Sequence, residues 1–264
     1  MLNIPKRLII SLILNIIMII FAISTIIIEI VNIHNSPDSV YQNVWGLFRY
    51  FTIDGNLLCL IFTTIITINQ IKAIRLPEGE SFKNLIFSHF LYLISLMSCC
   101  TELVIFVVVV FIFIPMADNE WRNALVGSFN ASSFHITIPI LINIRFIFLD
   151  VRERDLKFKE KFIGGLPMCS YGIIMYILCG SKIFKTFDKD KNGGDGKIPY
   201  PFLDIYHQNL FFCIFSAIFI FAFGFSIGFL LDYLNKIFKD FFSPYEKLES
   251  DNEEEKNTKI LNQA

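Results

Sequence analysis

The length of its apolar runs limits what this chain can fold into. The first run, residues 8–33, carries a single charged side chain, Glu29. As a helix rising 1.5 Å per residue it extends roughly 39 Å, which exceeds the ~30 Å hydrocarbon core of a bilayer. A soluble fold would interrupt such a run with polar residues at helix or strand spacing. Five further runs follow, at about residues 51–71, 85–114, 125–149, 163–184 and 209–231.

These six runs predict a polytopic membrane protein of the all-α class. None of them shows the ten-residue alternation of an outer-membrane barrel strand. The first run is also too long for the ~7–15-residue core of a cleaved signal peptide, so we expect it to be retained. Residues 1–240 are therefore expected to form one bundle of six transmembrane helices. Residues 241–264 carry mixed charge without an apolar period, which predicts a charged, disordered tail.

The lysines and arginines of the loops predict the orientation of the bundle. With the N-terminus in the cytoplasm, 15 of the 23 basic residues lie in inner segments and 7 in outer segments, while Arg145 lies inside the fourth run. Cytoplasmic loops of membrane proteins carry the excess of such residues. Both termini are therefore expected in the cytoplasm, and the second and fourth runs are expected to pass from outside to inside.

Composition argues against several kinds of binding site. The six cysteines all lie inside apolar runs, without the spacing of a disulfide framework or a metal site. We therefore expect buried free thiols, and neither a metal nor another cofactor. The formal net charge of −1 argues against a nucleic-acid partner. Membrane lipids are the expected surroundings and partners.

One outer loop contains half of a calcium-binding motif. Residues 188–193, DKDKNG, match the first half of an EF-hand loop. The second half fails, because Asp195 stands where an apolar residue is usual and Pro199 where a bidentate glutamate is needed. No flanking helix pair fits the motif either. We therefore expect a solvated polar turn here rather than a calcium site.

Three polar side chains open the second run, where the chain enters an apolar environment. Thr52 and Asn56 are four residues apart and share a helix face, whereas Asp54 points elsewhere. Capping of the helix start explains one polar residue, because side-chain oxygens satisfy the first N–H groups of a helix. Capping does not explain three.

Two ionisable residues lie deep in the runs. His135 lies about ten residues into the fourth run, roughly 15 Å deep at helical rise, and Pro139 follows one turn later. Glu102 lies near the middle of the third run. Intramembrane ionisable residues are costly and mark functional sites. A neutral histidine bonded to a neighbouring helix is an equally good interpretation of His135, and Glu102 fits orientation of a histidine, proton relay or a protonated structural role.

Three short motifs occur in a fixed order: YFTIDGNLL at 50–58, FHITIPIL at 134–141 and IPYPFLD at 198–204. Together they resemble the six-span family of androgen-induced and androgen-dependent TFPI-regulating proteins, in its bacterial branch. The resemblance covers the chain from the first run to Leu231. It implies an integral protein of the bacterial plasma membrane.

The resemblance also implies an activity. Animal members of the family are threonine hydrolases that cleave fatty acid esters of hydroxy fatty acids. Thr52 matches the position of their nucleophile and His135 that of their second essential residue. Here proline follows His135 at the fourth position, whereas the animal proteins carry one more residue between the two. The family signature also includes Pro199, Tyr200, Pro201 and Phe202, whose role the resemblance does not assign.

Three functions are consistent with these residues. The first is a hydrolase of lipid esters in which Thr52 attacks the carbonyl, His135 is the base, Asn56 is an oxyanion donor and Asp54 supports the site. The second is a small transporter or channel in which His135 and Glu102 relay protons. The third is a non-catalytic membrane scaffold in which the polar residues join helices. A hydrolase needs Thr52 and His135 close together, whereas a carrier needs a continuous polar path.

We predict that a cysteine introduced at Asn192 reacts with a membrane-impermeant maleimide added outside intact cells, because the loop after the fifth run is expected outside. A cysteine introduced at Lys157 is the matched inner-loop control and should react only in permeabilised cells. Labelling of Asn192→Cys from the cytoplasmic side alone would invert the orientation.

Overall fold

The computed structural model describes residues 6–35, 50–75, 88–116, 122, 125–150, 154–181, 203, 205 and 209–261. Every regular element in this part of the chain is helical, and six helices are long and apolar enough to cross a membrane. The expected all-α bundle of six spans is therefore confirmed. The spans are Arg7–Asn32, Phe51–Ile74, His89–Phe113, Phe129–Leu149, Phe158–Gly180 and Leu210–Phe238.

Three of the spans are single helices and three are composite. The single ones are α1 (Lys6–Asn35), α3 (Phe51–Ile74) and α12 (Leu210–Leu261). The third span consists of α5 (His89–Val107), η1 (Val108–Phe113) and α6 (Ile114–Met116). The fourth consists of α8 (Phe129–Ser132), η2 (Ser133–Thr137) and α9 (Ile138–Leu149). The fifth consists of α10 (Phe158–Lys161), η3 (Phe162–Gly165) and α11 (Leu166–Gly180).

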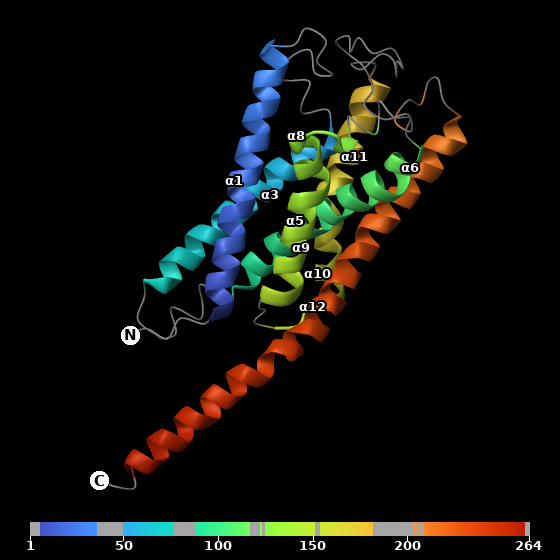
Figure 1. Ribbon diagram of the computed structural model, residues 1–264. Helices are drawn as coiled ribbons and strands as arrows, with labels where there is room; N and C mark the ends of the chain where they lie inside the picture. The colour runs from blue at the N-terminus through green and yellow to red at the C-terminus, as the bar shows by residue number, and fades with distance from the viewer. Residues whose placement is uncertain are drawn as a thin grey trace.

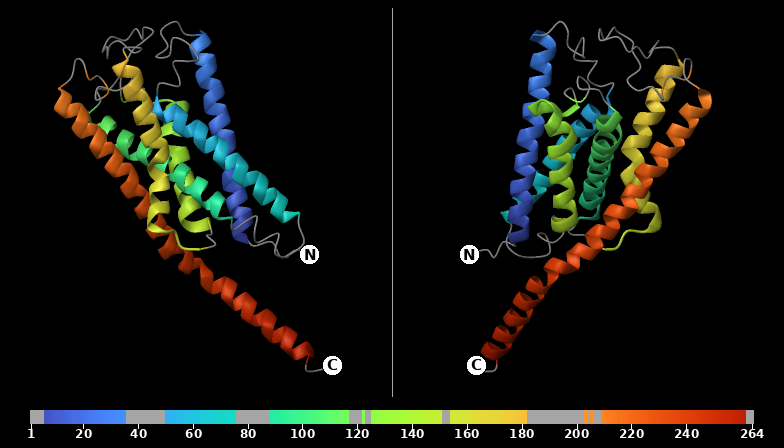
Figure 2. Two further views of the ribbon diagram at one scale, coloured as in Figure 1. Left: turned by 180° about the vertical axis from the view of Figure 1, so that it is seen from behind. Right: turned by 45° about the vertical axis from the view of Figure 1, so that its right-hand side comes forward.

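Helices α5 and α9 form the centre of the bundle. They pack against each other, and both contact α12, while α1 packs on α3 and α9 and α3 packs on α5. Figure 1 and Figure 2 show the N-terminus and the C-terminal extension of α12 at the same end of the bundle. We call this the inner end, following the predicted orientation, and the opposite one the outer end.

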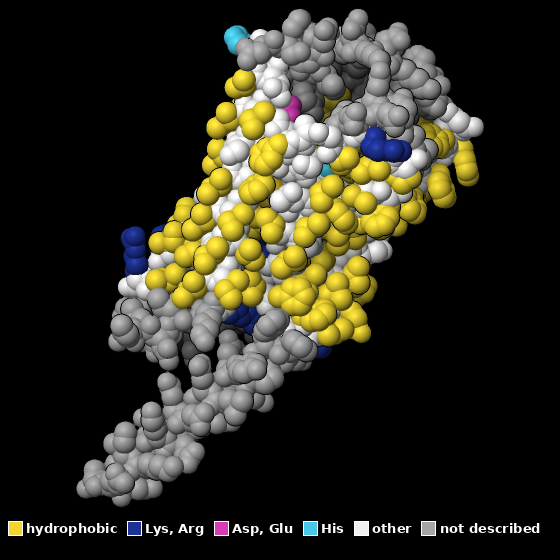
Figure 3. All heavy atoms as spheres, in the orientation of Figure 1, with side chains coloured by type: hydrophobic (Ala, Val, Ile, Leu, Met, Phe, Trp, Pro, Cys, Tyr) yellow, Lys and Arg dark blue, Asp and Glu magenta, His cyan; other side chains and the backbone are white. Residues whose placement is uncertain are grey.

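The flanks of the bundle are covered with apolar side chains. Figure 3 shows hydrophobic residues over the faces of the spans, with basic side chains near the two ends. Large exposed examples are Ile20 on α1, Phe111 on η1 and Phe211 on α12. Such a surface suits contact with lipid tails and would be costly to expose to water.

Two of the composite spans contain π-turns, and each π-turn is followed by a proline. In η2 the N–H of Ile138 donates to the carbonyl of Ser133, five residues earlier. Pro139 follows, and it has no N–H to donate to the carbonyl of His135, four residues before it. The wider turn accommodates this missing bond, so the helix changes its geometry at His135. Pro115 follows η1 in the same way.

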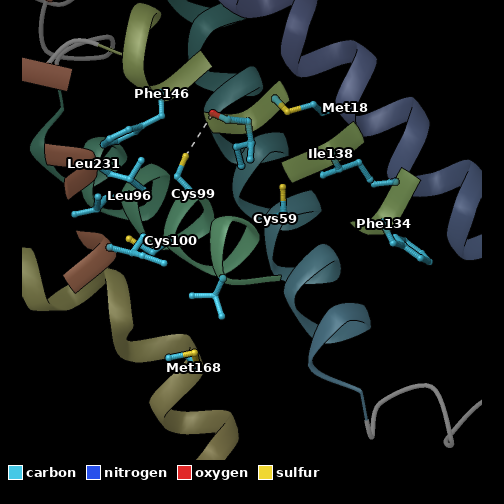
Figure 4. Close-up of a cluster of buried hydrophobic side chains, with 14 of the residues drawn as sticks. Met18, Cys59, Leu96, Cys99, Cys100, Phe134, Ile138, Phe146, Met168 and Leu231 are labelled. Carbon is cyan, nitrogen blue, oxygen red and sulfur yellow. Dashed lines mark hydrogen bonds between the residues drawn. The ribbon is translucent and has the colours of Figure 1, made fainter. Parts of the chain in front are cut away.

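The apolar core lies between α3, α5 and α9. Figure 4 shows Cys59, Cys99, Phe134 and Ile138 among its side chains, with the Cys99 thiol donating to the carbonyl of Ile142 at 3.5 Å. All six cysteines are free, and all are buried except the half-buried Cys169. The expectation of free thiols is confirmed.

A close backbone approach fastens α12 to the fifth span. A side-chain carbon built on Gly228 would lie 2.4 Å from the carbonyl oxygen of Lys161. One turn later, Lys161 Nζ pairs with the buried Asp232 at 2.8 Å. Small residues at helix crossings are characteristic of membrane bundles, where close packing replaces the hydrophobic effect between helices.

The most extensive polar cluster surrounds Arg145, which is 0% exposed. Its Nη1 donates to Asn15 Oδ1 on α1 at 2.8 Å, and its Nη2 lies 3.2 Å from the Asp150 carboxylate. The hydroxyl of Ser95 accepts from Nη2 and donates to Asp150. The guanidinium thereby joins α1, α5 and the residue that ends α9.

The same cluster extends to α3 and α12. Asn15 donates to Gln70 of α3 at 2.9 Å, and Gln70 donates to Ser11 at 2.9 Å. Asn235 of α12 donates to the carbonyls of Phe146 at 2.7 Å and Asp150 at 3.0 Å. Five of the six spans are therefore tied together near the inner end.

The tail differs from its sequence expectation. Helix α12 continues past the membrane span to Leu261, so residues 241–261 are helical, whereas the composition predicts a disordered tail. The physical reason is that α12 supplies an existing helix for the tail to extend, so that no new nucleus has to form. Residues 188–196 and 199–202 lie outside the described part of the chain.

We predict that Arg145→Ala lowers the free energy of unfolding by about 3–5 kcal/mol, because it leaves the partly buried Asp150 carboxylate without its charged partner and Asn15 without a donor. Urea unfolding in detergent, followed by circular dichroism, measures the change. Lys72→Ala on the exposed end of α3 is the control and should change stability by less than about 0.5 kcal/mol. Equal unfolding midpoints for Arg145→Ala and the parent would contradict the role of the cluster.

Candidate functional site

Thr52 lies in the first turn of α3, at the outer end of the bundle, and is half-buried. The helix begins after Tyr50, whose extended backbone (φ −105°, ψ 123°) turns the chain into the helix and whose carbonyl accepts from Ile53 N at 3.0 Å and Asp54 N at 3.2 Å. The N-cap residue Tyr50 makes no side-chain cap hydrogen bond. Thr52, Asp54 and Asn56 lie inside the helix, so none of them occupies the N-cap position.

Asn56 joins the second span to the fourth. It is 0% exposed, and its Nδ2 donates to the backbone carbonyl of Thr52 at 2.8 Å and to that of Phe134 at 3.3 Å. Phe134 directly precedes His135 in η2, which packs against α3. One side-chain amide thus holds together the backbone segments that carry Thr52 and His135, although 78 positions separate Asn56 from Phe134.

The expected role of Asn56 as oxyanion donor is not met in this arrangement. Both hydrogens of its amide group point at backbone carbonyls, so no proton is left for a substrate oxygen. The amide cannot be turned over, because its oxygen would then face two carbonyl oxygens. Asn56 Oδ1 lies buried without a donor from the described residues.

His135 lies in the π-turn η2, with a fixed ring orientation. Its Nδ1 lies 2.6 Å from the carbonyl oxygen of Leu125. A carbonyl only accepts, so this nitrogen carries the proton, and in the neutral ring Nε2 is the acceptor. The short helix before it starts at Ser128, whose hydroxyl accepts from Ala131 N at 3.1 Å. The backbone of Ala131 is a second hydrogen-bond partner of the ring, so the orientation of His135 is set by two backbone groups.

Glu102 lies on α5 beside the start of α3. A side-chain carbon built on Gly55 would lie 2.6 Å from Ile105 Cδ1, 2.8 Å from Thr101 Cγ2 and 3.9 Å from Glu102 Oε1. Gly55 therefore lets α5 approach α3 closely. Glu102 is 0% exposed, and neither of its carboxyl oxygens has a hydrogen-bond partner among the described residues.

The structure brings some of the candidate residues together and leaves others apart. Asn56 links the backbones of Thr52 and of Phe134, which precedes His135, but no hydrogen bond joins the Thr52 hydroxyl to the imidazole among the described residues. Asp54 is half-buried and shares no hydrogen bond with either residue in the same part of the chain. The structure therefore associates Asn56, more closely than Asp54, with the Thr52 and His135 segments.

The signature Pro199, Tyr200, Pro201 and Phe202 lies outside the described residues. Leu203, which follows it directly, is fully buried against Met175 and Cys179 of α11. Leu203 is therefore anchored at the outer end of the fifth span.

Sequence reasoning missed one polar contact of the outer half. Asn130 of α8 donates to Glu29 of α1 at 3.2 Å. Glu29 is the single charged residue of the first apolar run. A lone charge in such a run indicates a polar partner on another helix, and this pattern could have pointed to the contact. The residues described contain no group of three or more histidine, cysteine, aspartate or glutamate side chains able to hold a metal ion.

Comparison with protein-family models, curated proteins and solved structures finds no match for this chain. The resemblance to the androgen-induced protein family therefore stays a prediction based on the three motifs.

We predict that Asn56→Ala lowers the free energy of unfolding by about 1–3 kcal/mol, because the buried Phe134 carbonyl and the partly buried Thr52 carbonyl each lose a donor. Asn69→Ala is a matched control on the same helix, since among the described residues Asn69 bonds to the carbonyl of Ile65 in its own helix, at 2.8 Å. Urea unfolding in detergent compares the two variants. An equal loss in both would show that the bond between the second and fourth spans contributes nothing.

Proposed function

We propose that this protein is a membrane-embedded hydrolase of lipid esters, with Thr52 as nucleophile and His135 as base. The observation that carries the proposal is the Asn56 amide, which donates to the carbonyls of Thr52 and Phe134 and so keeps the two segments in register. A threonine hydroxyl becomes a useful nucleophile when a base takes its proton. His135 offers Nε2 for this purpose, because Nδ1 is bonded to Leu125.

The chemistry runs through an acyl-enzyme. Thr52 Oγ attacks the ester carbonyl while its proton passes to His135 Nε2. The carbon–oxygen bond to the alcohol then breaks, and the alcohol leaves with the proton from Nε2. Water attacks the acyl group in the second half of the reaction, the acid is released and Thr52 regains its proton.

A different group must stabilise the oxyanion, since the Asn56 amide is already bonded. The first N–H groups of a helix have no partner within it and carry the positive end of the helix dipole. In α3 these belong to Phe51 and Thr52, next to the proposed nucleophile. Backbone N–H groups in this position suit a developing negative charge.

The setting supports a lipid substrate. The spans carry exposed apolar side chains along their flanks (Figure 3), so an ester with long chains can reach the bundle from the bilayer. The proposed substrate class is the fatty acid ester of a hydroxy fatty acid, which follows from the family resemblance.

A proton-coupled carrier is the second candidate, and one observation favours it. Below Glu102, the buried atoms Ser98 Oγ, Asn143 Oδ1 and Arg145 Nε also lack hydrogen-bond partners among the described residues. These three atoms lie on residues that run from near Glu102, in the middle of the bundle, to the Arg145 cluster near the inner end. A path for protons across the membrane would run in the same direction. In that case Thr52→Ala would leave transport intact, whereas Glu102→Gln would stop it.

We predict that Thr52→Ala abolishes labelling by a fluorophosphonate probe and hydrolysis of lipid esters, since no hydroxyl remains to form the acyl-enzyme. Thr52→Ser should keep part of the activity. His135→Ala should lower kcat/KM by about 10²–10⁴-fold, the usual contribution of a general base. Hydrolysis by protein purified in detergent is measured by chromatography of the released acid.

Thr64→Ala is the matched control for these variants. Thr64 lies on the same helix, is half-buried and donates only to the carbonyl of Leu60 in its own turn, at 2.7 Å. Parent-like activity is expected for it. Hydrolysis by Thr52→Ala at the rate of the parent would end the assignment of the nucleophile, and the carrier would then be the better proposal.

A further inference from the structure

Three acceptor oxygens are buried together with no hydrogen-bond donor from the described residues. They are Oε1 and Oε2 of Glu102 and Oδ1 of Asn56, on two side chains that are 0% exposed. Buried polar atoms in folded proteins are nearly always hydrogen-bonded, to protein or to internal water. Unpaired acceptors in this position therefore point to a bound donor.

The three oxygens belong to one junction of the bundle. α3, α5 and η2 contact one another in pairs. Glu102 Oε1 lies 3.9 Å from the point that a Cβ atom would occupy on Gly55. Asn56 is the next residue along α3. A side-chain carbon on a helix leans towards the N-terminus, so the Gly55 position leans towards the turn that contains Thr52. The carboxyl group is therefore about one helical turn from the proposed nucleophile.

The surrounding side chains do not supply the donor. The Thr101 hydroxyl donates to the carbonyl of Met97 at 2.9 Å. Both hydrogens of the Asn56 amide point at carbonyls, and His135 Nδ1 is bonded to Leu125. No ion pair joins Glu102 to a basic residue in the described part of the chain, where Arg145 pairs with Asp150. A protonated carboxyl group that donated to Asn56 Oδ1 would still leave its own carbonyl oxygen without a donor.

We propose that Glu102 and Asn56 Oδ1 bind a resident water molecule, and that this water hydrolyses the acyl-enzyme. The catalytic part rests on the proposed function. Water has two donor hydrogens, so one molecule can donate both to a carboxyl oxygen and to an amide oxygen. The hydrocarbon core of a bilayer contains no bulk water. A bound water molecule would therefore supply the reactant that hydrolysis of the acyl-enzyme needs inside the bundle.

The bound water hydrolyses the ester bond between the acyl group and Thr52. The water oxygen forms a bond to the acyl carbon, and one water proton passes to His135 Nε2. The bond between the acyl carbon and Thr52 Oγ breaks, Nε2 returns its proton to Oγ, and the free acid leaves. Glu102 is a positioning residue in this step, because it orients the water and bonds to no reacting carbon.

The test separates formation of the acyl-enzyme from its hydrolysis. Parent, Glu102→Met and Glu102→Gln are mixed with a long-chain p-nitrophenyl ester in detergent micelles. The burst of p-nitrophenolate reports acylation, the steady rate reports hydrolysis, and intact-protein mass shows the acyl adduct. In Glu102→Met the burst should persist while the steady rate falls about 10- to 100-fold, the cost of a misplaced reactant. Glu102→Gln, which keeps one oxygen able to accept from water, should lose less of the steady rate than Glu102→Met does.

A second readout detects the water without catalysis. X-ray radiolysis of water inside a protein oxidises adjacent side chains within milliseconds. Cys59 lies one turn from Gly55 on the buried face of α3 and should be oxidised in the parent but not in Glu102→Met. Cys100 is the control, because it is equally buried but packs against Gly164 of the fifth span.

The outcomes are distinct. An unchanged steady rate in Glu102→Met, or an unlabelled Cys59 in the parent, overturns the water site. A parent that never forms an acyl adduct overturns the proposed function and with it the catalytic role of the water, while Cys59 labelling still decides whether water is bound. If Glu102→Met fails to fold, labelling of the parent decides the site and the mass of its acyl adduct decides the chemistry.

Discussion

At the inner end of the bundle, the guanidinium of Arg145 lies where no solvent reaches it. A charge in such a place is tolerated only with close partners, and these come from Asn15, Ser95 and Asp150 on three different parts of the chain. The position of α9 relative to α1 and α5 follows from this pairing. Asn15 also bonds to Gln70 on α3. The hydrogen bonds around Arg145 therefore fix the relative positions of most of the spans.

The outer half is organised differently. Around Arg145 most polar groups are bonded to one another, whereas near Thr52 the oxygens of Glu102 and Asn56 have no donor among the described residues. A network in which most groups are paired stabilises a fold, while one whose acceptors lack donors can bind a small polar molecule. The fixed inner cluster and the unsaturated outer junction lie on the same helices, so the first holds the second in place. This is the arrangement that a reactive site inside a bilayer requires.

Backbone geometry, as well as side-chain bonding, determines where the candidate residues lie. Pro139 removes one donor from the fourth span, and the helix widens into a π-turn at His135. Gly55 has no side chain, so α5 approaches α3 closely enough to place Glu102 beside it. Neither residue reacts in the proposed chemistry. Both decide where the residues that do react, or that hold water, can lie.

The sequence by itself determined the six spans, because length and hydrophobicity are local properties of each run and the bilayer sets the length required. It also identified Thr52, His135, Asn56 and Glu102, since polar residues in apolar runs are visible without a structure. Only the tertiary structure decided their partners. Asn56 bonds to Phe134, 78 positions away, and Arg145 bonds to Asn15, 130 positions away. Such pairings depend on which helix faces meet, and that is fixed by the packing of the spans together rather than by the spacing within any one of them.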